Sequence, residues 1–162
     1  MAGPAAGAPY RPDDDALVLE RLSASVPLPS DAMPADLETA TQRARAWIEQ
    51  ARASGDPRFL GYAEGALQPW SSELAPPTPV LLLRATLRQS RHDFAGAMND
   101  LQTLLARDPG DVQALLTKAT VLRVQGSLPA AAAACAGLRD HASEFVATLC
   151  SSAVRGLAGE HD

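Results

Sequence analysis

The chain has 162 residues and a mass of 17.0 kDa, which suits one domain or one short repeat array and excludes a large multidomain enzyme. Hydrophobic residues make up 46% and charged residues 20%, so burial can offset the entropy of ordering most of the chain. Lys and Arg number 14 against 19 Asp and Glu, and the net charge of −5 would repel a phosphate backbone. We therefore expect no nucleic-acid partner.

The composition also narrows the fold class. Aromatic residues are only 4% of the chain and alanine is abundant, which favours close-packed helices over twisted sheets. No run approaches the roughly 18 apolar residues of a membrane-spanning helix, and two cysteines cannot by themselves supply a structural zinc site. The sequence predicts an all-α protein with no membrane insertion, no metal and no cofactor.

The N-terminal third of the chain differs from the rest. Residues 1–12 combine Ala, Gly and Pro with little to bury and are expected to be a disordered leader. In the segment 13–33, Asp13–Leu22 is compatible with a short helix that begins with acidic residues. This opening resembles that of some exported proteins after signal removal, so the expected location is either cytoplasmic or, with a processed N-terminus, periplasmic. The chain could equally be one piece of a longer array.

Helical periodicity begins at Pro34 and continues to the C-terminal region, so residues 34–162 are expected to form one helical domain. Gly55, Gly126 and the Pro109-Gly110 pair interrupt the pattern, and Asp56, Asp93 and Ser127 stand where helix N-caps are expected. The predicted helices are residues 37–54, 57–68, 80–89, 94–106, 112–125, 129–139 and 143–157. Their short connections predict antiparallel helix pairs.

An internal repeat of 34 residues runs through this domain. Ala85, Ala119 and Ala153 are separated by steps of 34, and so are Leu81, Leu115 and Leu149. In the second helices Ala97 matches Ala131 at the same step, and Trp47, Ala51 and Ala63 continue the phase backwards. Small residues at these positions allow two helix axes to approach closely.

This pattern resembles the tetratricopeptide repeat, a family of paired helices. The resemblance implies a right-handed solenoid of about three repeats, residues 44–77, 78–111 and 112–145, with a capping helix at 146–157. Arg84 and Arg88 depart from it, since they stand where the family has apolar or aromatic residues.

The resemblance also implies a non-catalytic scaffold that holds a peptide or helix of a partner protein on the concave face of its first helices. The positions that line this groove in the family are occupied here by Arg45, Ile48, Arg52, Leu82, Thr86, Gln89, Ser90, Gln113, Leu116, Thr120, Arg123, Val124, Cys150 and Val154. Leucines replace the polar residues of a carboxylate clamp, so we expect an apolar stripe flanked by arginines. Such a stripe suits an amphipathic partner that carries acidic residues.

Two alternatives to a free groove stay open. The apolar stripe could be partly core, or the segment Asp13–Leu22 could cover it, because large exposed apolar patches are rare on monomers. The array could also be a structural module that forms a homodimer through its ends or its inner stripe. In either case we expect no enzyme activity.

Few residues suggest chemistry. His92, His141 and His161 share no helical face with one another or with a cysteine, and catalysis requires such groups to converge. Asp13, Asp14 and Asp15 lack the glycine and distal glutamate of a calcium loop. Cys135 and Cys150 are 15 residues apart; two buried thiols are the favoured interpretation, with a disulfide as the alternative.

Overall fold

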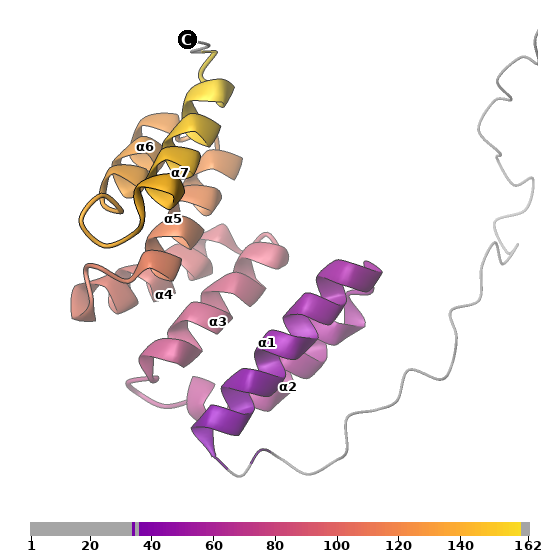
Figure 1. Cartoon of the computed structure of the whole chain (residues 1–162). Coiled ribbons are helices and arrows are strands. Elements are labelled where there is room, and N and C mark those ends of the chain that lie inside the picture. Colours follow the sequence, from indigo (N-terminus) through magenta and orange to yellow (C-terminus); the bar gives the residue numbers. More distant parts are fainter. Residues whose placement is uncertain (1–33, 35, 160–162) are drawn as a thin grey trace, which may run out of the picture. The chain divides into compact units, whose positions relative to one another are not determined.

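A computed structural model describes residue 34 and residues 36–159, which belong to one of the two units into which the chain divides, residues 32–162. All regular structure in the described residues is α-helical (Figure 1). The predicted helix at Asp13–Leu22 lies outside these residues. The helices are α1 (Leu37–Ser54), α2 (Arg58–Ser71), α3 (Thr78–Ser90), α4 (Phe94–Arg107), α5 (Val112–Val124), α6 (Leu128–Ala136) and α7 (Glu144–Leu157).

Local sequence signals set the helix ends. The side chain of Asp93 accepts a hydrogen bond from the backbone N–H of Gly96 at 2.9 Å, which confirms it as the N-cap of α4. Asp36 and Asp111 cap α1 and α5 in the same way. Gly55 ends α1 with a φ of 70°, a left-handed conformation that glycine adopts without strain. Ser127 precedes α6 as expected, but its side chain makes no capping hydrogen bond.

Two predicted ends were wrong. Helix α2 continues through Pro69 to Ser71, because a proline in the last turn costs only one intrahelical hydrogen bond. Helix α6 ends at Ala136, three residues early, and a series of turns follows. A Cβ at Gly137 would lie 3.3 Å from Leu115, so the chain passes close to α5 there and brings Leu138 into the core.

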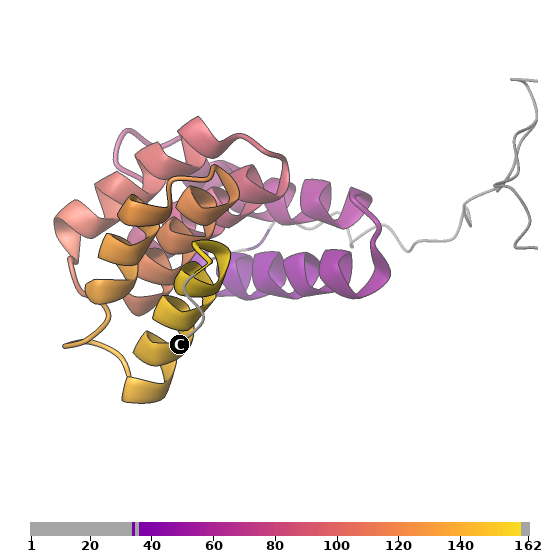
Figure 2. The same cartoon turned by 90° about the horizontal axis from the view of Figure 1, so that it is seen from above.

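The helices form three antiparallel pairs, α1 with α2, α3 with α4 and α5 with α6, followed by α7 (Figures 1 and 2). Each odd-numbered helix also contacts the next odd-numbered helix along the chain. No such contact joins α2 to α4 or α4 to α6 in the described part of the chain. The odd-numbered helices are therefore the closely spaced layer, and the even-numbered helices lie on its outer side.

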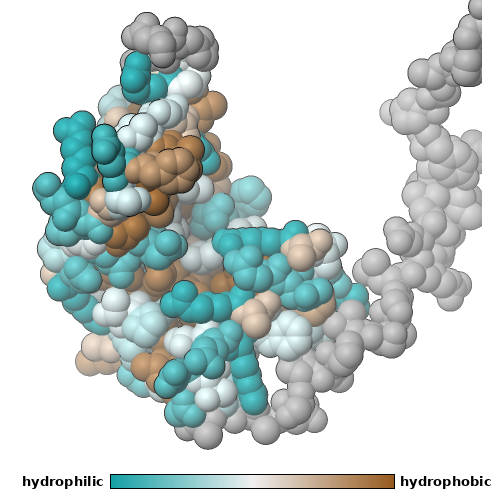
Figure 3. Space-filling view, in the orientation of Figure 1, coloured by the Kyte–Doolittle hydropathy of each residue, from teal (hydrophilic) through white to brown (hydrophobic). Residues whose placement is uncertain are grey.

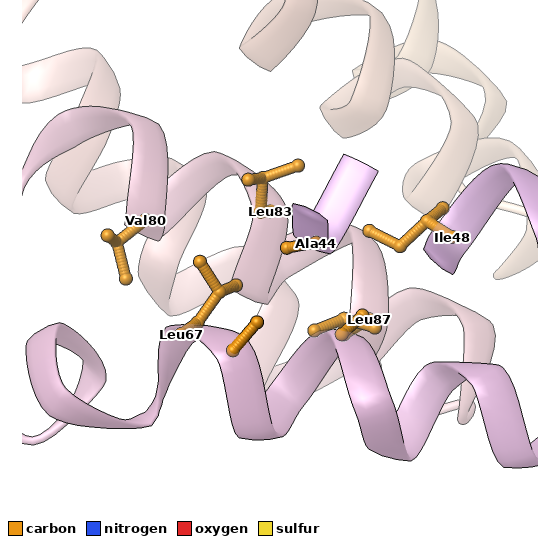
Figure 4. Packing of buried hydrophobic residues seen from close by; sticks show 8 residues of the cluster. Ala44, Ile48, Leu67, Val80, Leu83 and Leu87 are labelled. Atoms are coloured by element: carbon orange, nitrogen blue, oxygen red, sulfur yellow. The ribbon is translucent and has the colours of Figure 1, made fainter. Parts of the chain in front are cut away.

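Alanines occupy the closest helix contacts. Ala63, Ala97 and Ala131 of the second helices are all 0% exposed, and Ala85 and Ala119 of the first helices are buried. Ala153 of α7 is only half-buried. Larger residues fill the neighbouring space; in Figure 4, side chains from three helices meet around Leu67, among them Ile48, Leu83 and Leu87.

Cys135 of α6 and Cys150 of α7 form a disulfide, so the expectation of two buried thiols was wrong. Their Cα atoms are 5.6 Å apart, within the range that a disulfide spans. A separation of 15 residues does not determine this distance. The turns of residues 137–142 reverse the chain between α6 and α7 and bring the two cysteines together.

Candidate binding surface on the odd-numbered helices

Two cavities lie beside the odd-numbered helices and contain most of the residues predicted for a groove. The first, of about 110 Å³, lies among α1, α3 and α5. Its predicted lining residues are Arg45, Ile48, Arg52, Leu82, Thr86 and Gln113. Glu49, Leu83 and Thr117 complete it.

The second cavity, of about 300 Å³, lies between α5 and α7 and is mainly apolar. Leu116, Thr120 and Arg123 line its α5 side, and Cys150 and Val154 are the predicted residues on α7. Ala119, Val146, Leu149 and Ala153 complete it. The disulfide fixes Cys150, and through it this part of α7, against α6.

Helix α5 connects the two cavities. Gln113 and Thr117 face the first cavity, and Leu116 and Thr120 face the second. Because these four residues follow one another at intervals of three, one and three, they form a single stripe on one helix face. The two cavities are thus neighbouring parts of one surface, which we call the inner surface.

The apolar residues of the inner surface differ in exposure. Ile48 is only 3% exposed and belongs to the core, so it forms the floor of the first cavity. Leu82 and Leu116 are half-buried and accessible to a ligand. The interpretation of the stripe as partly core therefore holds for Ile48.

Arginines stand at the edges of both cavities. Arg52 pairs with Glu49 of the same helix at 2.7 Å, and both side chains are largely exposed. Arg45 and Arg123 have no ion pair with any residue that the structure describes. The inner surface therefore combines an apolar floor with cationic groups available to a negatively charged ligand.

The structure leaves Gln89 outside both cavities; it is half-buried one helical turn beyond Thr86. Ser90 and Val124 are exposed and also line neither. Sequence reasoning missed Glu49 and Thr117, although both follow predicted groove residues directly in sequence. It also missed Leu149, whose repeat phase predicts burial in a helix pair.

The described histidines do not meet at a site. His92 is exposed in the turn before α4, where its ring contacts Phe94 edge-on at 5.5 Å. His141 is exposed in the turns after α6 and lies against Gly110. His161 lies outside the described residues. In the part of the chain that the structure covers, no three acidic, His or Cys side chains group to hold a metal ion.

No described helix is both long and apolar enough to cross a lipid bilayer. Neither a protein-family model, nor a curated protein, nor a solved structure matches the chain.

Proposed function

We propose that residues 34–162 form a tetratricopeptide-type solenoid that acts as a non-catalytic scaffold, binding an acidic amphipathic segment of a partner protein on the inner surface. One observation carries the proposal. Residues chosen by their repeat phase on α1, α3 and α5 line two adjoining cavities. A 34-residue periodicity of buried alanines and the contacts between successive odd-numbered helices support the solenoid.

The chemistry of the surface suggests the chemistry of the partner. Half-buried Leu82 and Leu116 offer apolar contact, while Arg45 and Arg123 offer positive charge at its margins. An amphipathic helix with leucines on one face and glutamates beside them would satisfy both features. Apolar contact supplies affinity, and the arginines favour acidic over basic partners.

A direct test uses two synthetic amphipathic peptides that differ only in having Glu or Lys on the polar face. We expect the Glu peptide to bind in fluorescence anisotropy and the Lys peptide not to bind. Leu82→Glu combined with Leu116→Glu should abolish binding while the far-UV circular dichroism stays unchanged. Arg45→Glu with Arg123→Glu should reverse the preference between the two peptides.

Arg139→Glu is the matched control, because Arg139 is exposed beyond α6 and lines neither cavity of the inner surface. This substitution makes the same charge change as the Arg45 and Arg123 variants. It should leave binding of the Glu peptide unchanged. If the leucine double variant binds as well as the unmodified chain, the inner surface is not the binding site.

The disulfide favours an oxidising compartment over the cytoplasm, since reducing systems keep most cytoplasmic thiols reduced. We therefore propose the periplasmic or exported location rather than the cytoplasmic one. Alkylation of the protein in acid-quenched native cells tests this, because a disulfide-bonded chain takes up the reagent only after reduction. Uptake before reduction would contradict the proposal.

A further inference from the structure

An apolar stripe runs along the exposed side of α7. Phe145 is 75% exposed and Leu149 is 59% exposed, and Figure 3 shows hydrophobic side chains gathered over this helix. Ser152 and Gly156 are also exposed and continue the stripe, because intervals of four, three and four residues keep one helix face. The stripe consists of Phe145, Leu149, Ser152 and Gly156.

The repeat shows what normally covers this side of a first helix. Leu81 of α3 is in the same repeat phase as Leu149, and it is buried in a cluster with Leu101 and Leu104 of its pair helix α4. Leu115 of α5, also in this phase, packs against Leu138 at the end of the α6 segment. In the described part of the chain, no second helix follows α7. The side that α3 and α5 cover with a pair helix is therefore open on α7.

We propose that α7 of a second copy of this chain covers the stripe, so that two α7 helices pair antiparallel about a two-fold axis. The large residues Phe145 and Leu149 lie in the N-terminal half of the stripe, and the small residues Ser152 and Gly156 lie in the C-terminal half. Antiparallel pairing places Phe145 against Gly156 of the second copy and Leu149 against its Ser152. The stripe is thus complementary to itself, as a two-fold interface requires.

The charges beside the stripe agree with this orientation. Glu144 is in the first turn of α7 and Arg155 in the last, and an interval of eleven residues places both on one flank of the helix. Antiparallel pairing brings Glu144 of each copy near Arg155 of the other. A parallel arrangement would instead place like charges side by side.

The size of the interface sets the expected strength. A helix of 14 residues is about 21 Å long, and a pair of such helices buries less than the roughly 1,200 Å² of a standard stable interface. The dimer is therefore weak and forms reversibly as the concentration rises. This separates it from the proposed peptide binding, since Phe145 and Gly156 line neither cavity of the inner surface.

Sedimentation velocity of the full chain over a wide concentration range tests the proposal. We expect the unmodified chain to shift from monomer to dimer. Phe145→Glu should raise the dissociation constant at least about tenfold, because it would bury a charge between the helices. Gly156→Leu should do the same by filling the space that Phe145 of the second copy enters.

Gly156→Leu is informative because a Cβ at this position meets no atom within 4 Å in the single chain and leucine favours helix. The monomer should thus keep its circular dichroism spectrum and its thermal stability. Leu74→Glu is the matched control, since Leu74 is a fully exposed apolar residue in the loop between α2 and α3. A chain that stays monomeric at every concentration overturns the proposal, as does dimerisation that survives both α7 substitutions.

Discussion

Arg84 of α3 and Asp100 of α4 form a two-point ion pair in which the carboxylate is only 1% exposed. Arg84 donates from Nε to Oδ2 at 2.9 Å and from Nη2 to Oδ1 at 2.6 Å. Hydrogen bonding to Asp100 raises the pKa of Arg84 above its ordinary value, so the guanidinium is charged at every accessible pH.

Two further hydrogen bonds extend this pair across three helices. Arg88 donates to Asp100 at 2.8 Å, and Arg84 also donates to the carbonyl oxygen of Ser71 at the end of α2 at 2.7 Å. No buried side-chain N or O atom in the described residues lacks a hydrogen-bond partner. The carboxylate therefore holds the two arginines that depart from the repeat pattern, and it ties the second pair to the first.

Asp100→Ala should lower the free energy of unfolding by about 3–5 kcal/mol, because it leaves two guanidinium groups without their buried partner. Urea denaturation followed by circular dichroism measures the change. Glu64→Ala is the control; it removes the exposed Arg91–Glu64 pair at 2.7 Å and should cost no more than about 1 kcal/mol. Equal effects of the two substitutions would show that Asp100 has no special role.

The repeat made much of the fold predictable. Small residues at fixed spacing are needed wherever two helices cross closely, and α3 and α5 accordingly begin at Thr78 and Val112, 34 residues apart. The ion pair was harder to foresee, since the residues in the phase of Asp100 are the buried alanines Ala66 and Ala134. A signal was nevertheless present: Arg84, Arg88 and Asp100 break the pattern within the same repeat.

The candidate site was predictable in its direction and not in its extent. Helical phase decides which side of α3 a residue faces, so Leu82 and Thr86 fall in the first cavity. Phase does not say how far along a helix a cavity continues, which explains Gln89. Burial by a pair helix depends on that helix being present, and this explains why Leu149 is exposed.

Ala97→Leu should destabilise the fold by about 1–3 kcal/mol, because Ala97 is 0% exposed in the cluster where α4 contacts α3 and α5. Ala95→Leu is the matched control on the same helix, since Ala95 is exposed and its change should stay within about 0.5 kcal/mol. Thermal unfolding of both variants measures the difference. Comparable melting temperatures would contradict the role assigned to the repeat alanines.

Asp36 should titrate below the ordinary aspartate value of 3.8. Its carboxylate accepts a hydrogen bond from the backbone N–H of Thr39 and another from the Thr39 hydroxyl, and these lower its pKa. Since the folded pKa lies below the unfolded one, the stabilisation of α1 is fully present above the unfolded pKa. It is lost as the pH falls through the folded pKa. Carboxyl-detected NMR measures the midpoint, and a value at or above 3.8 would contradict the capping role.

Replacing Cys135 and Cys150 together by alanine should lower the free energy of unfolding by about 3 kcal/mol, the value expected for a closed loop of about 15 residues. Because the disulfide joins α6 to α7, amide hydrogen exchange should rise most in α7 and little in α1 and α2. Reduced unmodified chain should behave like the double variant, and a reductant should not affect the variant itself. If the oxidised chain and the double variant unfold at the same urea concentration, the disulfide does not stabilise α7 against the rest of the fold.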